Sequence, residues 1–216
     1  YNQLQLPDNN KVKMLFEEWR TLYGQVADLS VSQEDEIRKI IGFNPPAIKK
    51  EPLACILFVI HTYNSIVIKL IAAEIVSKIA SLSSYTDFAQ SAAVLEDDEL
   101  VECIKTDIER GEFYKRANLK GFVEEALFSW YIDVYELGIL KEGISDSLRS
   151  ILIRLSTYQM GNLSDARTND VLKRFYQNLV PDVMRKSLGE FYTPDWLIEV
   201  MLDKVQGDIA EMRFLD

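Results

Sequence analysis

The segment Leu53–Leu82, LACILFVIHTYNSIVIKLIAAEIVSKIASL, is the most apolar part of the chain. It is unbroken from Leu53 to Ile60, and polar side chains follow at His61, Asn64, Ser65, Lys69, Glu74 and Lys78. A membrane-spanning helix needs about twenty nearly uncharged residues. The segment is therefore predicted to form one long helix, buried centrally as the spine of a helical domain.

Helical periodicity on both sides of this segment predicts a mainly α protein. Residues 11–23 carry apolar side chains on one helical face, at Val12, Leu15, Phe16, Trp19, Leu22 and Tyr23. Shorter helices are predicted from Ser32 to Gly42, from Asp87 and after the acidic run at 96–99. Three more are predicted over 119–140, ending near Gly138, over 144–160 and over 169–180.

Composition narrows the functional classes. The 216 residues carry a formal net charge of −10, with 48% hydrophobic and 27% charged residues, which is ordinary for a soluble globular chain. Such a charge argues against this chain being the main phosphate-binding surface of a DNA-binding protein. Four basic residues lie near the C-terminus: Lys173, Arg174, Arg185 and Lys186. They either contact the DNA backbone or only form the solvent-exposed faces of helices.

No catalytic residue and no metal site is predicted. The acidic run Glu96–Glu99 could hold a divalent metal, but acidic residues are also favoured at a helix N-terminus, and the apolar residues that follow have helical spacing. Cys55 and Cys103 lack metal-ligand spacing and are expected to be buried reduced thiols, as in a cytoplasmic protein. The only histidine, His61, lies within the apolar segment and is expected to be a hydrogen-bonded core residue.

The residues that suggest a binding function are concentrated in one segment near the C-terminal end, Leu188-Gly189-Glu190-Phe191-Tyr192-Thr193-Pro194-Asp195-Trp196-Leu197. Gly189 suits the end of one helix, Thr193 the N-cap of the next and Pro194 its first position. A helix N-terminus favours a carboxylate or phosphate, and two aromatic residues stand directly before this one.

Together with its lead-in, Arg174–Pro181 and Arg185-Lys186, this segment resembles the N-terminal motif of amino-directed DNA methyltransferases. These are adenine-N6 enzymes of restriction-modification and phage-defence systems that use S-adenosylmethionine. The resemblance reaches back loosely to Glu109–Tyr114 and Gly121–Tyr131, so it covers residues 109–216. The family's Asn/Asp-Pro-Pro-aromatic catalytic motif is not matched by Asn44-Pro45-Pro46-Ala47, which is interpreted as a proline-ordered linker.

The resemblance implies that Phe191, Tyr192, Thr193, Pro194 and Asp216 bind S-adenosylmethionine. It implies a helical domain over 1–170 and the first helix and strand of a truncated Rossmann-type methyltransferase domain over 171–216. The expected function is that of an N-terminal fragment, inactive alone, of a cytoplasmic DNA adenine methyltransferase. Its expected partners are DNA and a nuclease or specificity module, with no membrane. The alternative is a non-catalytic, acidic helical module for protein interactions.

Overall fold

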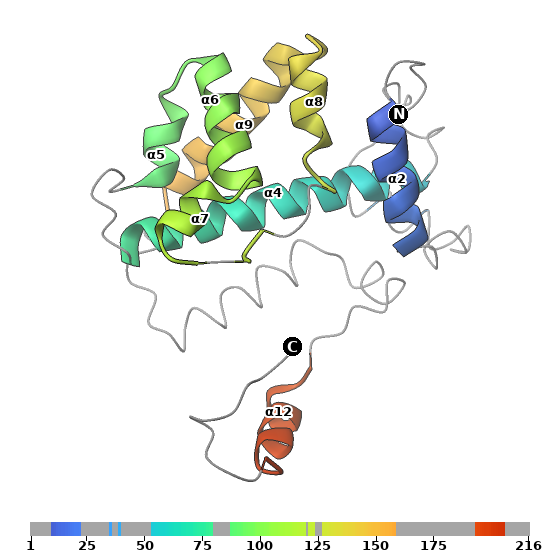
Figure 1. The fold of residues 1–216 in the computed structure, drawn as a ribbon, viewed down its shortest axis with the longest axis vertical. Coiled ribbons are helices and arrows are strands. Elements are labelled where there is room, and N and C mark those ends of the chain that lie inside the picture. The colour runs from blue at the N-terminus through green and yellow to red at the C-terminus, as the bar shows by residue number, and fades with distance from the viewer. Residues whose placement is uncertain are drawn as a thin grey trace.

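Helix α4 runs through the middle of the molecule and carries the long apolar segment (Figure 1). The computed structural model describes residues 10–22, 35, 39, 53–79, 87–119, 121–123, 127–158 and 193–205, and within these ranges it is mostly helix with no strand. The prediction of a mainly α protein is confirmed for them. The helices are α2 (Asn10–Leu22), α4 (Leu53–Ile79), α5 (Phe88–Ala93), α6 (Asp97–Cys103), the π-helix η3 (Ile104–Glu109), α7 (Glu112–Arg116), α8 (Trp130–Glu136), α9 (Lys141–Ser156) and α12 (Asp195–Leu202).

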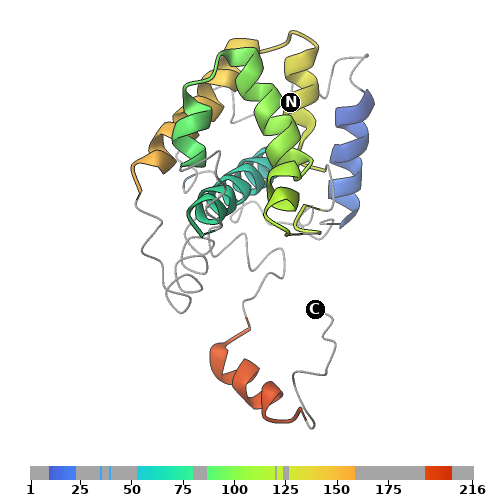
Figure 2. The ribbon, with the colours of Figure 1, turned by 60° about the vertical axis from the view of Figure 1, so that its left-hand side comes forward.

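The helices between residues 88 and 156 pack on one side of α4. Figure 1 shows α5, α6, α8 and α9 on that side, with α7 running beside α4, and the rotated view of Figure 2 shows the same arrangement. Helix α2 crosses the N-terminal half of α4 and contacts both α4 and α8. The long helix α4 is therefore shared by most of the bundle, with contacts to α2, α5, η3, α7 and α9.

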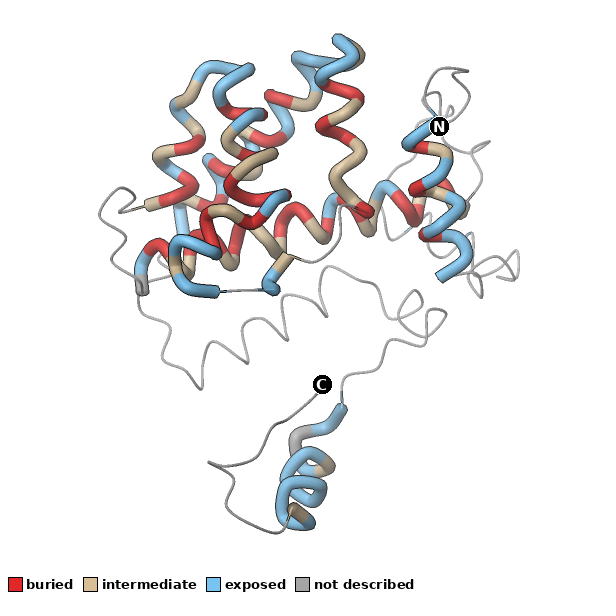
Figure 3. The backbone as a smooth tube through the Cα atoms, viewed as in Figure 1, coloured by how far each residue is buried: buried red, intermediate tan, exposed pale blue. Residues whose placement is uncertain are grey.

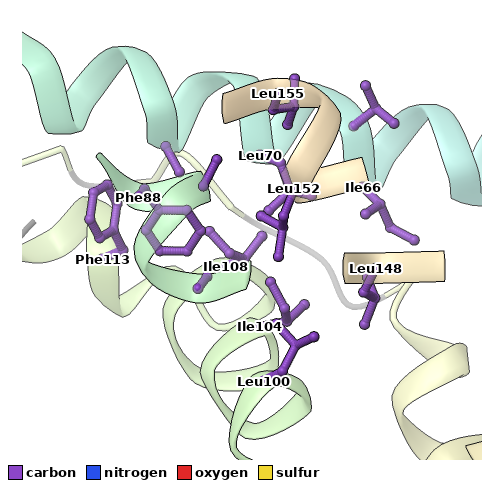
Figure 4. Packing of buried hydrophobic residues seen from close by; sticks show 14 of the residues in the cluster. Ile66, Leu70, Phe88, Leu100, Ile104, Ile108, Phe113, Leu148, Leu152 and Leu155 are labelled. Carbon is purple, nitrogen blue, oxygen red and sulfur yellow. The ribbon is translucent and has the colours of Figure 1, made fainter. Parts of the chain in front are cut away.

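The core of the bundle lies between α4 and the helices that cover it (Figure 4). Ile66 and Leu70 of α4 meet residues of α9, and α5, α6, η3 and α7 close the other sides. Burying such a side chain stabilises the fold by about 1.5–3 kcal/mol each. The labelled members are Ile66, Leu70, Phe88, Leu100, Ile104, Ile108, Phe113, Leu148, Leu152 and Leu155.

Length and composition alone would allow α4 to cross a membrane. The window Ala54–Lys78 has a mean hydropathy of 1.8, and 56% of it is buried. The core helix of a soluble protein satisfies the same criterion, and the burial of Glu74 and the pairing of Lys69 fit that role. The expected absence of a membrane partner and the cytoplasmic location stay predictions.

Several local predictions are confirmed. The face of α2 predicted to be apolar buries Val12, Leu15 and Trp19, whereas Leu22 at the end of this face is exposed. The helix predicted to begin at Asp87 is α5, and Asp87 is its N-cap, where its side chain accepts a hydrogen bond from the Gln90 amide. The acidic run lies at the start of α6, with Asp97, Asp98 and Glu99 in its first turn.

The predicted single helix over 119–140 is wrong. Within the described residues of this span, only Trp130–Glu136 forms a helix. The backbone turns into the left-handed region at Asn118 (φ 62°) and Gly121 (φ 72°), so apolar residues with helical spacing are distributed over a turn and a short helix. The predicted end near Gly138 is confirmed, with φ of 75° there. The next helix, predicted over 144–160, begins at Lys141 and ends at Ser156.

Other predictions fall outside the described residues. These include the Asn44–Ala47 linker, the helix over 169–180, the strand leading to Asp216 and the domain boundary at 170/171. The Rossmann-type start of a second domain and the division into two domains therefore stay predictions.

Candidate functional site

The predicted cofactor-binding segment is described only at its C-terminal side. Thr193 and Pro194 are both exposed, immediately before α12. Phe191, Tyr192 and Asp216 lie outside the described residues, as do the four predicted DNA-contacting cations Lys173, Arg174, Arg185 and Lys186.

The start of α12 differs by one residue from the prediction. Pro194, with φ −61° and ψ 141°, occupies the N-cap position, and its carbonyl accepts from the amides of Leu197 at 2.9 Å and Ile198 at 3.2 Å. Thr193 was expected at the N-cap and instead precedes it. Proline suits either position because it has no N–H to leave unpaired and its φ is already close to the helical value.

This geometry can bind an anion. The first amides of an α-helix have no partner within the helix, and together with the helix dipole they favour a carboxylate or phosphate. The exposed Thr193 hydroxyl, one residue before the N-cap, is a further donor beside the same helix end. The described residues at this helix start therefore offer hydrogen-bond donors, and the binding of a cofactor there stays a prediction.

Helix α12 is apolar and yet exposed (Figure 3). The side chain of Trp196 is 64% exposed, and in both ribbon views α12 lies apart from the bundle. Large exposed apolar groups of this kind indicate a surface that another structural element covers. The other exposed members are Ile198, Val200, Met201 and Leu202.

A buried polar cluster within the bundle was missed by sequence reasoning. Lys69 Nζ on α4 donates to Glu109 Oε2 at 2.7 Å, and Tyr131 OH on α8 donates to Glu109 Oε1 at 2.8 Å. Tyr114 OH donates to the Lys69 carbonyl. Burial, with the charge of Glu109 nearby, raises the pKa of both Tyr114 and Tyr131.

The backbone explains how Glu109 reaches this cluster. It is the last residue of the π-helix η3, whose wider turn is closed by the Arg110 amide bonding to the Lys105 carbonyl at 3.1 Å. Gly111 follows at φ 73°, and a Cβ there would lie 3.3 Å from the side chain of Val123. A charged residue inside the apolar segment, Lys69, was the one sequence signal that a buried partner exists.

A second buried carboxylate joins α4 to α5. Glu74 is fully buried, and its Oε2 accepts from the Ala89 amide at 2.9 Å. Lys78 Nζ lies 3.7 Å from Oε1 and 3.4 Å from Asp87, so it bridges two carboxylates. Burial raises the pKa of Glu74, although the hydrogen bond from Ala89 acts in the opposite direction.

The acidic start of α6 is used in ion pairs. Arg149 on α9 binds Asp97 at 2.6 Å and also donates to the carbonyls of Ala93 and Leu95. Asp98 accepts from Lys141 at 3.0 Å and from Tyr135 at 2.7 Å, contacts that lower the pKa of Asp98. In the described ranges, no group of three or more His, Cys, Asp or Glu side chains is arranged to hold a metal ion.

The surroundings of the two cysteines and of His61 fit structural roles for these residues. Cys55 is buried and Cys103 half-buried, and both thiols are free. Burial, with the nearby charge of Asp107, raises the pKa of Cys103 to about 11, which disfavours a nucleophilic thiolate. His61 is half-buried, and its Nδ1 accepts a hydrogen bond from Trp19 Nε1 at 3.2 Å.

Comparison with known proteins assigns no family, because no protein-family model, curated protein or solved structure matches this chain.

Proposed function

We propose that this chain is the N-terminal part of a DNA adenine-N6 methyltransferase of the restriction-modification or phage-defence type. It would supply a helical domain and the first elements of the methyltransferase domain. The observation that carries the proposal is the start of α12, where exposed Thr193 and Pro194 lead directly into a helix N-terminus. This arrangement fits the Phe191-Tyr192-Thr193-Pro194 sequence that resembles the family's cofactor-binding motif.

Each residue of the motif has a role in this proposal. The Thr193 hydroxyl and the first amides of α12 hold the methionine carboxylate of S-adenosylmethionine, because both are donors at the positive end of the helix dipole. Phe191 and Tyr192 wall the site, and Asp216 faces the cofactor's amino group. When bound, S-adenosylmethionine would supply the methyl group that is transferred to the N6 amino group of adenine.

The exposed apolar residues of α12 support the placement of this helix in a second domain. In Rossmann-type folds a helix packs its apolar side chains against a parallel sheet, and an uncovered α12 has the side chains for such packing. The side chain of Leu197 is half-buried, whereas Trp196 and Ile198 on either side of it are exposed.

Contact with DNA is proposed through the four cations at 173, 174, 185 and 186. The bundle offers little for this purpose, because the first turn of α6 presents Asp97, Asp98 and Glu99 to solvent. Acidic surfaces repel the phosphate backbone. In this proposal the bundle instead packs against the catalytic domain or against a nuclease or specificity module.

A binding measurement tests the site. The natural open reading frame that contains this chain would be expressed, and its binding of S-adenosylmethionine measured by titration calorimetry. Thr193→Ala is expected to weaken binding by roughly tenfold, the size of one hydrogen bond to a charged group. Thr157→Ala is the matched control, because Thr157 is an exposed threonine directly after α9.

Two outcomes would overturn the proposal. One is equal affinity of the wild-type and Thr193→Ala proteins for the cofactor. The other is the absence of cofactor binding by the wild-type protein. The 216-residue chain alone is expected to transfer no methyl group to DNA, so methylation by it would also contradict the assignment.

The acidic surface favours one second candidate, a non-catalytic module that binds a basic protein partner. Glu102 continues the exposed acidic face of α6 by one further turn beyond Glu99. The coding sequence after Asp216 separates the two functions. Pro-x-x-Gly-x-Gly followed by Asn/Asp-Pro-Pro-aromatic supports the methyltransferase, whereas a stop codon supports the interaction module.

A further inference from the structure

The contact between α2 and α4 contains a hydrogen bond that depends on the protonation state of one residue. Trp19 is 1% exposed, and its Nε1 donates to Nδ1 of His61 at 3.2 Å. The two rings meet edge to face, with centroids 5.6 Å apart and planes at 89°. An indole nitrogen is only a donor, so Nδ1 of His61 must carry no proton in this arrangement.

The hydrogen bond lies in an aromatic cluster that holds α2 in place. Phe16 and Trp19 of α2 contact Phe58 of α4, with ring centroids 5.5 and 5.6 Å apart, and Phe128 lies 6.3 Å from His61. Trp19 is the only one of these rings that hydrogen-bonds to His61 among the residues described here. Ring packing and this hydrogen bond thus both contribute to the contact between α2 and α4.

Ion pairs on the neighbouring elements lie outside the ring cluster. Lys11 on α2 binds Asp133 on α8 at 2.8 Å, Arg20 pairs with Glu17 at 3.6 Å, and Glu136 on α8 pairs with Lys105. Among the described residues, the charged side chains of α2, which packs on α4, and of α8, which contacts α2, are Lys11, Lys13, Glu17, Glu18, Arg20, Asp133 and Glu136. Of these seven, all but Lys13 and Asp133 are exposed.

We propose that His61 is a pH-sensitive latch for α2, which is released as His61 becomes protonated. A protonated imidazole carries N–H groups on both nitrogens, so Nδ1–H would face the Trp19 N–H and the hydrogen bond would be lost. Protonation of His61 therefore weakens the docking of α2, and α2 is docked most firmly above the pH range in which His61 titrates.

Helix α4 also accepts a hydrogen bond from a second indole through a side chain that does not titrate, and this contact serves as a reference. Trp130 Nε1 on α8 donates to Thr62 Oγ1 at 2.8 Å, one residue after His61, and Thr62 Oγ1 donates to the Phe58 carbonyl at 2.9 Å. A hydroxyl neither gains nor loses a proton between pH 5 and 8. Of these two indole contacts on α4, the latch therefore predicts a pH-dependent hydrogen bond only for Trp19.

Nuclear magnetic resonance of the three tryptophan indole N–H groups tests the latch. Spectra of the 15N-labelled chain from about pH 5 to 8 span the ordinary histidine range, and Trp19→Phe, Trp130→Phe and Trp196→Phe assign the signals. The Trp19 signal is expected to move most with pH, the Trp130 signal less because its ring stacks on Phe58 of the same cluster, and the distant Trp196 signal not at all. His61→Asn, whose side-chain oxygen can accept from Trp19 at any pH, is expected to abolish the movement.

The wild-type chain also provides a test that needs no variant. His61 is the only histidine, so its ring C–H signals titrate without overlap. Their midpoint is expected to equal the midpoint of the Trp19 indole signal. Different midpoints, a Trp19 signal that does not move, or an equal movement in His61→Asn would overturn the proposal.

Discussion

Helices α4 and α12 are both rich in apolar residues, but their surroundings differ. In α4, Leu57, Phe58, Leu70 and Ala73 are buried, and the bundle even encloses its charged residue Glu74. In α12, Trp196, Met201 and Leu202 are more than half exposed. Apolar composition predicts that a helix needs a partner, but it does not say whether the partner is in the same bundle.

The largest expected effect comes from the buried ion pair. Glu109→Ala leaves Lys69 buried without its partner and should lower the free energy of unfolding by about 3–5 kcal/mol. Urea denaturation followed by circular dichroism measures this loss. Glu102→Ala on α6 is the control, because Glu102 is exposed and should cost less than about 1 kcal/mol. Equal losses would show that the bundle does not depend on this pair.

The next effect compares two leucines directly. Leu152 of α9 is fully buried, whereas Leu202 of α12 is 52% exposed. Leu152→Ala should lower the free energy of unfolding by about 2–5 kcal/mol through lost burial and a cavity. Leu202→Ala should change the free energy of unfolding by less than about 0.5 kcal/mol. A large loss for Leu202→Ala would mean that α12 is packed as firmly as the bundle.

A smaller effect is expected from the arginine that joins α9 to α6. Arg149→Ala removes bonds to the Ala93 and Leu95 carbonyls and to Asp97, and should cost about 1–3 kcal/mol. Arg154→Ala on the same helix is a matched control, because Arg154 is exposed and should cost less than about 0.5 kcal/mol. Thermal unfolding of both variants tests whether this contact fixes the α5–α6 turn. A loss no larger than that of Arg154→Ala would contradict it.

The smallest effect is expected in the pH dependence of the bundle's free energy of unfolding. Burial raises the pKa of Glu74 above its usual 4.5, so the folded state holds this proton more tightly than the unfolded state does. The stability that Glu74 contributes is therefore fully present below pH 4.5 and falls as the pH rises through the folded-state pKa. Glu74→Gln should remove this dependence, which urea unfolding at pH 4.5 and 7.5 would show. An unchanged slope would rule out Glu74 as its source.

Sequence reasoning succeeded where the signal is local. The face of α2, the helix start at Asp87 and the acidic start of α6 depend on residues within one or two helical turns of each other, and all three were predicted. The prediction failed over 119–140, because the helical spacing of apolar residues continues across Gly121, whereas the backbone leaves the helical conformation there. At the candidate site, the sequence predicted the start of α12 to within one residue. Phe191, Tyr192 and Asp216, the other predicted residues of this site, lie outside the described residues.

The order and polarity of the residues were enough to indicate a mainly helical chain, with the long helix at its centre and a helix start after Thr193. These features follow from periodicity and from the conformations that glycine and proline allow. The pairing of Lys69 with Glu109, forty residues apart, and of Trp19 with His61, forty-two apart, was decided only by the tertiary structure. Such contacts depend on how whole helices pack, and no pattern within one helix specifies which buried donor meets which acceptor.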